Sequence, residues 1–245
     1  MFKLTEKNCA DLKGEVVDGR MSVAGMRRYL VPVLIVSGLF VGISYMMANA
    51  NTIGWDTLSN GWHMLFYTEA VLLILHALAI ILCWGNNGFN QKVLSLVVVA
   101  CTYRLAFEPY IFILMFSKDR GTYESYLPII PVIIICALVF HVIVFRSRVK
   151  KRKRDTANLS NSQKMSNPKS KLLLPILFPL VIVSGSIARN GLLGDFEIVF
   201  MLLVFAILTF SLMLVLSEFI IACYCILRFP SFSVDAPKPK KMQRR

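Results

Sequence analysis

Long apolar runs without a single charge constrain this chain more than any other feature of its sequence. The clearest run, residues 29–48, contains no Asp, Glu, Lys or Arg. About 20 apolar residues, each rising about 1.5 Å in an α-helix, cross the ~30 Å hydrocarbon core of a bilayer. The composition agrees, because 56% of the 245 residues are hydrophobic and only 17% are charged, against about 25% in soluble domains. We therefore predict an all-α integral membrane protein.

Six long apolar runs, three of them without any charge, divide the chain. We predict transmembrane helices over residues 29–48, 64–84, 93–116, 127–145, 172–188 and 196–227. The last run is longer than the core requires, so we expect it to tilt or to project from the membrane. The chain then has five parts: an N-terminal segment 1–28, a four-helix unit 29–145, a basic linker 146–171, a two-helix unit 172–227 and a basic tail 228–245.

The basic residues predict the orientation of these helices. The chain has 27 Lys and Arg residues against 14 acidic ones, a net charge of +13. If the N-terminus is cytoplasmic, 23 of the 27 fall in inside segments, 3 fall outside and Arg104 lies within a span. Cytoplasmic loops carry such an excess of Lys and Arg. We therefore predict a multi-pass protein of the cell (inner or plasma) membrane with both termini cytoplasmic, and no nucleic-acid partner.

The second and third predicted spans carry four ionisable residues that form one group. Glu69 and His76 share one face of the second span, and Arg104 and Glu108 share one face of the third. The two spans are joined by a short turn and are expected to be antiparallel neighbours, which puts Glu69 at the depth of Glu108 and His76 at that of Arg104. This polar track either carries protons or an anion, or is a structural pair that locks two helices together.

Small residues predict where helices contact one another. The first span contains Gly38-x-x-x-Gly42 beside Ser37, and the fifth contains Ser184-x-x-x-Ala188. Such spacing lets two helix backbones approach closely. The contact is expected either within one molecule or between subunits.

A dense basic run directly follows the fourth span. Adjacent anionic lipid headgroups stabilise such a run, which also stops membrane transfer. At a similar depth, Glu218 and His141 are expected to extend toward the headgroups. The predicted headgroup contacts are Arg146, Arg148, Lys150, Lys151, Arg152, Lys153 and Arg154.

No pattern in the sequence predicts a cofactor, a metal site or a catalytic residue. The six cysteines form no Cys-x-x-Cys pair and are expected to pack as small apolar residues. Three function classes stay open. The first is a non-enzymatic accessory, immunity, exclusion or assembly component that contacts other membrane proteins or itself. The second is a small transporter or channel subunit that uses the polar track. The third is a membrane-embedded enzyme, for which His63 and Glu69 would form an acid–base pair.

Overall fold

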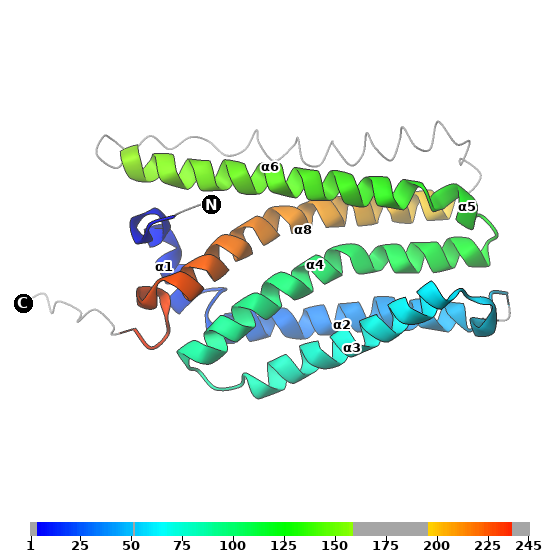
Figure 1. Ribbon diagram of the computed structural model, residues 1–245, viewed down its shortest axis with the longest axis horizontal. Helices are drawn as coiled ribbons and strands as arrows, with labels where there is room; N and C mark the ends of the chain where they lie inside the picture. The colour runs from blue at the N-terminus through cyan, green and yellow to red at the C-terminus, as the bar shows by residue number, and fades with distance from the viewer. Residues whose placement is uncertain (1–3, 51, 159–195, 237–245) are drawn as a thin grey trace, which may run out of the picture.

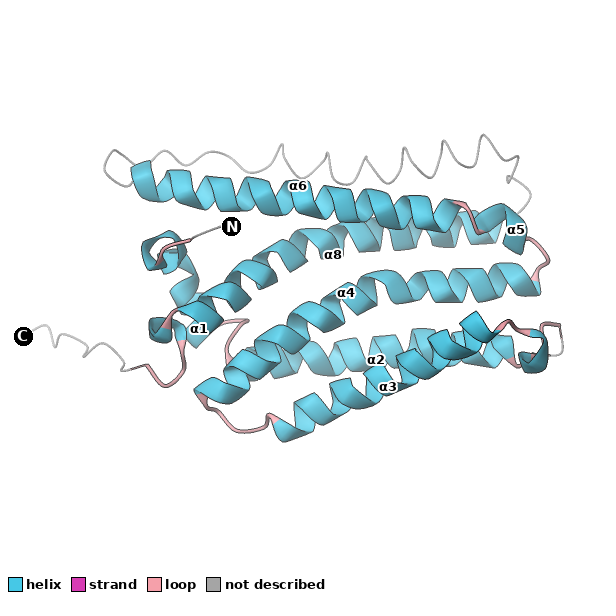
Figure 2. Ribbon diagram, viewed as in Figure 1, coloured by secondary structure: helices cyan, strands magenta, loops and turns pink. Residues whose placement is uncertain are grey.

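The computed structural model describes residues 4–50, 52–158 and 196–236, and these residues form helices and connecting turns without any strand (Figure 2). Five of the described helices are long and apolar enough to cross a membrane. They are α2 (Val23–Ala48), α3 (Asn60–Leu82), α4 (Gly88–Asp119), α6 (Ile129–Asn158) and α8 (Phe196–Arg228). The all-helical, membrane-type class predicted from the sequence is thus supported.

Short elements connect or flank the long helices. The chain begins with η1 (Glu6–Leu12) and α1 (Lys13–Val17), and η5 (Pro230–Phe232) follows α8. Between long helices lie η2 (Trp55–Thr57) and α5 (Tyr123–Tyr126). The predicted fifth span, residues 172–188, and with it Ser184 and Ala188, lies outside the described residues.

Several helices extend beyond the predicted spans because polar residues start and continue them. The Ser22 hydroxyl accepts a hydrogen bond from Gly25 N at 3.1 Å, which starts α2 six residues early. The Asn87 side chain caps α4 in the same way, at 2.7 Å from Asn90 N. The α6 helix does not end at residue 145 but continues through the basic run to Asn158, since Lys and Arg favour a helix.

The long helices alternate in direction until α6 and then depart from that order (Figure 1). The termini-side end of the bundle, defined here as the end where η1, α1 and η5 lie, holds the start of α2, the end of α3 and the start of α4. Arg120, which lies between α4 and α6, pairs with Glu197 at the start of α8. Arg148, late in α6, pairs with Glu218, late in α8, so α6 and α8 run in the same direction. The segment between α6 and α8 lies outside the described residues, so six spans stay a prediction.

The α4 helix is the centre of the bundle. It packs against α2 on one side and α8 on the other, and α6 packs on the far side of α8. The α3 helix lies at the periphery and contacts both α2 and α4. Figure 1 shows that α4 bends near its middle. Pro109 lies inside this helix, and a proline there removes one backbone hydrogen bond and favours a kink.

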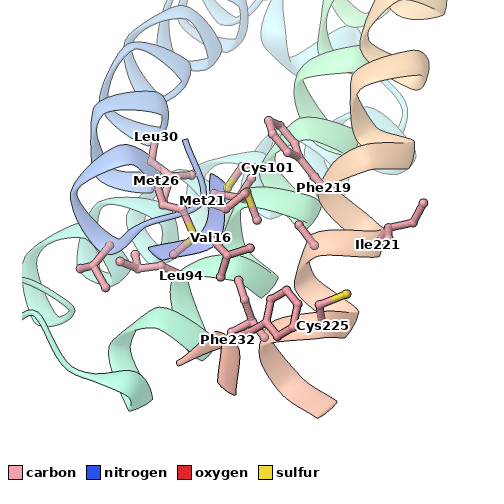
Figure 3. Close-up of a cluster of buried hydrophobic side chains, with 14 of the residues drawn as sticks. Val16, Met21, Met26, Leu30, Leu94, Cys101, Phe219, Ile221, Cys225 and Phe232 are labelled. Carbon is pink, nitrogen blue, oxygen red and sulfur yellow. The ribbon is translucent and has the colours of Figure 1, made fainter. Parts of the chain in front are cut away.

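Buried apolar side chains of the described residues form three clusters, of which the largest closes the termini-side end (Figure 3). Val16 of α1, Met26 of α2, Leu94 of α4, Cys225 of α8 and Phe232 of η5 all belong to this cluster. A second cluster fills the space between α4, α6 and α8. The third is a small group near η2 at the opposite end. The two ends of the described chain are therefore parts of one folded core.

Hydrogen bonds fasten the segments that precede α2 and follow α8 to α4. The fully buried side chain of Gln91 donates to the carbonyl of Val16 at 3.0 Å and accepts from Val234 N at 2.9 Å. The carboxylate of Asp235 accepts a 2.8 Å bond from Gly88 N at the start of α4. An anion at a helix N-terminus satisfies free N–H groups and complements the helix dipole.

Candidate functional site

A buried ion cluster joins α3 to α4. Arg104 pairs with Glu108 one turn further along α4, and its Nε lies 3.5 Å from Oε2 of Glu69 on α3. The side chains of Glu69 and Arg104 are about one-tenth exposed, and that of Glu108 is fully buried. The structure thus brings together three of the four residues of the predicted polar track.

The cluster lies at the middle depth of the bundle. Arg104 is at the centre of α4, and Glu69 is in the middle third of α3. Charges at such a depth in a bilayer cost about 2.5–3.5 kcal/mol each on insertion scales unless a partner or water compensates them. The mutual pairing of these side chains supplies that compensation.

The charges of the cluster do not balance. One guanidinium faces two carboxylates, so a fully ionised cluster carries one excess negative charge. A single proton shared by Glu69 and Glu108 makes it neutral. The second oxygen of Glu108 and Nη2 of Arg104 have no hydrogen-bond partner among the described residues. The arrangement can therefore bind one proton or one small polar group.

His76 does not join the ion cluster directly. It is buried on the same face of α3 as Glu69, two turns away, and faces the backbone of Leu30 on α2. Neither ring nitrogen makes a well-formed hydrogen bond within the described part of the chain. The predicted proximity of His76 to Arg104 is present only as an electrostatic interaction between the two side chains.

Two of the four buried side chains of α3 are polar. Its buried side chains are Phe66, Glu69, His76 and Ile80. Apolar contacts alone do not drive helix association in lipid, where the surrounding chains are equally apolar, so interhelical polar contacts and close packing decide it. The ion pair to Arg104 is therefore a main fastening of this peripheral helix.

The predicted small-residue contact of α2 is only partly used within the described helices. Ser37 is fully buried. A Cβ added at Gly38 or at Gly42 would meet no neighbour within 4 Å. Tyr45 lies on the same face and packs its ring against Phe66 of α3, with centroids 5.8 Å apart. The two glycines therefore form an open edge of α2 on the side that faces α3.

The basic run of α6 is divided between protein and surface. Arg148 pairs with Glu218 of α8, and Arg152 donates two hydrogen bonds, 2.6 and 2.8 Å long, to Asp11 of the N-terminal segment. These two cations are thus engaged by acidic side chains of the protein, and contact of the seven cations with lipid stays a prediction. Exposed members of the run are Arg146, Lys150, Lys151, Lys153 and Arg154.

The structure also corrects the prediction for His141. Its side chain is buried, and its Nδ1 lies 3.0 Å from the carbonyl oxygen of Met213 on α8, so it does not extend toward a headgroup. A similar polar contact, absent from the sequence prediction, joins α8 to α4. The Thr209 hydroxyl lies 2.8 Å from the Ala106 carbonyl and 3.0 Å from the Tyr110 hydroxyl. An isolated Thr or Tyr in an apolar run gives no periodic signal that would reveal such a contact.

The acid–base pair that an enzyme would need is not formed. Nε2 of His63 lies 3.0 Å from the carbonyl of Trp55 in η2, whereas Glu69 is engaged by Arg104. No group of three or more His, Cys, Asp or Glu side chains among the described residues could hold a metal ion. Each of these polar groups has a local structural role instead.

Comparisons with known proteins do not narrow the class further. No protein-family model, no curated protein and no solved structure matches this chain. The fold is all-helical over the described residues and compatible with a multi-pass membrane protein, and any function must be argued from the chain itself.

Proposed function

We propose that this chain is a non-enzymatic component of a membrane assembly that acts by contacting another membrane protein. The open edge formed by Gly38 and Gly42 carries this proposal. Glycines four residues apart let a second helix approach a transmembrane helix closely, and van der Waals contact along such an edge drives association in lipid. The occupant we propose is a transmembrane helix of a different protein.

The polar fastening of α3 supports the same function. Because Glu69 fastens α3 to α4, against which α2 also packs, the edge is held next to a fixed neighbour, and the contact of Tyr45 with Phe66 closes one end of it. Exposed apolar side chains border the edge, among them Ile35 and Leu39. A partner helix would therefore find glycines at its centre and large apolar residues around them, as interhelical contacts in membranes require.

Site-specific photocrosslinking in native membranes tests this proposal. A photoreactive residue at Ile35, on the face of the two glycines, is expected to give one discrete adduct with another membrane protein. The same residue at Ile135 of α6 is the matched control, because the two isoleucines are 58% and 60% exposed. Gly42→Leu fills the edge, and its Cβ would meet no neighbour within 4 Å, so the adduct should disappear while the protein level stays normal.

Three results would refute the proposal. Equal adducts from both positions would indicate random collisions in the membrane. An adduct with a second copy of the chain would make the edge a self-association site. A crosslink to a segment of the same chain outside the described residues would show that the molecule itself covers the glycines.

A small proton-coupled transporter or channel subunit is the second candidate, and the charge imbalance of the ion cluster favours it. Glu69 and Glu108 share one guanidinium, and His76 extends the row of buried titratable groups along α3. Side chains of this kind at mid-membrane depth commonly bind protons on a transport path. This candidate needs the cluster to change its protonation during function, whereas the first needs only that it stays paired.

Substitution of the pair on α4 distinguishes the two candidates. For a structural cluster, Arg104→Gln and Glu108→Gln should each lower the protein level, and a variant that carries Glu69→Gln together with both changes should restore it, because no charge is then left unpaired. For a proton path, all three variants should be present at normal level, and proton uptake by proteoliposomes should fall to the background of empty vesicles. A wild-type protein that moves no protons would remove the second candidate.

A further inference from the structure

A cavity at the termini-side end lies between the last turn of α8, the first turns of α4 and the segment that follows η5. Its volume is about 350 Å³. The polar residues around it are Lys92, Arg228, Ser233 and Asp235, and Ile226, Leu227 and Pro230 form the apolar part of its wall. The position is distinct from the ion cluster and from the basic run of α6.

The cations of this cavity are available for a ligand. Lys92 and Arg228 are both exposed, and neither forms an ion pair with a described residue. Asp235, the acid of the cavity, already accepts the N–H of Gly88, and the N-terminus of α4 partly compensates its charge. With two cations and one engaged carboxylate, the cavity keeps an excess positive charge.

The Ser233 hydroxyl provides a neutral hydrogen-bond donor beside the two cations. The Ser233 hydroxyl oxygen accepts a 3.3 Å bond from Asp235 N, which leaves its own O–H able to donate into the cavity. Two cations and a hydroxyl donor around one space match the oxygens of a phosphate group, for which charge-assisted hydrogen bonds are the strong contacts.

The place of the cavity in the fold indicates the source of the phosphate. Arg228 ends α8, the most apolar of the described spans, and Leu227 beside it is half exposed. The cavity thus lies where a membrane-spanning helix gives way to polar chain, which is the depth of lipid headgroups. The apolar wall then faces the start of the acyl chains, whereas a free phosphate has no use for it.

The cavity is formed before any ligand binds. Gln91, the residue before Lys92, holds Val234 and thereby fixes the segment that carries Ser233. The bond from Gly88 N to Asp235 fixes the same segment at a second point. A preformed site lowers the entropy cost of binding. We propose that this cavity binds a phosphate group, and specifically the headgroup phosphate of an anionic phospholipid.

Native mass spectrometry of the full chain in detergent tests the proposal with phosphatidylglycerol and phosphatidylcholine as probes. We expect phosphatidylglycerol to stay bound in preference to phosphatidylcholine. The double variant Lys92→Gln with Arg228→Gln should weaken its binding about 30-fold, since each cation near a headgroup contributes a factor of about five. Both positions are exposed, so the variant should fold normally, which its thermal unfolding checks.

A control variant separates the cavity from general surface charge. Lys151→Gln with Arg154→Gln removes two exposed cations at the same end and gives the same change in net charge. Its effect on phosphatidylglycerol binding should be several-fold smaller. Equal losses in the two double variants, or equal retention of both lipids by the wild type, would overturn the proposal.

A competition experiment identifies the source of the phosphate. Excess inorganic phosphate should not displace phosphatidylglycerol, because it lacks the acyl chains that meet Leu227 and Pro230. Complete displacement, together with loss of phosphate binding in the Lys92 and Arg228 variant, would show that the cavity binds phosphate but would overturn the assignment to a lipid headgroup.

Discussion

Replacing Gln91 by leucine should release the two terminal segments from the bundle. The side chain is fully buried and bonds to both segments, at 3.0 Å to the Val16 carbonyl and 2.9 Å to Val234 N. Leucine has a similar volume and cannot replace either bond. The change therefore removes the two hydrogen bonds of Gln91, which we call the Gln91 latch, while it leaves the apolar packing around this side chain in place.

The magnitude follows from the two partners that lose their bonds. A buried group left unpaired costs about 1–3 kcal/mol. Val16 is fully buried and should incur the larger part of that cost, whereas Val234 is half-buried and its N–H can bond to water. We expect a loss of about 2–3 kcal/mol in the free energy that holds the segments closed. Their opening constant should then rise roughly 30- to 150-fold.

Hydrogen–deuterium exchange in lipid nanodiscs measures this opening. Peptides that cover residues 13–17 and 229–236 should exchange faster by about that factor in Gln91→Leu, while peptides from the middle of α2 should not change. Ser95→Ala is the matched control, because Ser95 is equally buried one turn along α4 and donates to the carbonyl of Lys92 on its own helix. Unchanged exchange of both terminal segments in a folded Gln91→Leu protein would refute the reasoning.

Three further contacts are tested by substitution and thermal unfolding in detergent, with control substitutions beside them. Gly88→Ala should destabilise the protein by about 1–3 kcal/mol, because its Cβ would lie 2.5 Å from the carboxylate oxygen of Asp235 that caps α4. Gly61→Ala is the control: this residue lies near the start of α3 without a close neighbour, so the change should be neutral or stabilising. Gly25→Ala should be destabilising for a similar reason, since its Cβ would lie 2.5–2.6 Å from two backbone oxygens of the preceding turn. Thr209→Val should cost about 1–2 kcal/mol by leaving the buried Tyr110 hydroxyl without its partner, and Tyr110→Phe in that background should cost little more; additive losses would contradict the contact.

The sequence was most informative where a physical rule acts over short distances. Long apolar runs with few charges revealed the four described spans before α8 and α8 itself to within a few turns, because bilayer thickness sets the length of such runs. The pairing of Arg104 with Glu108 was accessible from their four-residue spacing, and the short turn between α3 and α4 indicated that Glu69 lies on the neighbouring helix. The contact of Glu69 with Arg104 itself was not predicted, because the sequence put His76 and not Glu69 at the depth of Arg104.

Contacts between distant parts of the chain were not accessible in this way. Arg148 was predicted to contact lipid, yet its partner Glu218 lies 70 residues away, and Asp11 lies 141 residues from Arg152. Nothing in a run of seven cations distinguishes the two that turn toward the protein. The helix starts at Val23 and Gly88 were missed for a smaller reason, because a hydropathy pattern does not register the capping residues that precede them.

The latch around Gln91 imposes an order on how the molecule is completed. Residues 230–235 leave the ribosome after the five long helices described above, so Gln91 and the Val16 carbonyl have been synthesised long before Val234 can bond to them. Until then the termini-side end lacks the hydrogen bond from Val234, and the place of Phe232 is unfilled. A nascent chain that stops short of this segment therefore leaves this end of the bundle open, and its closure has to follow the synthesis of α8.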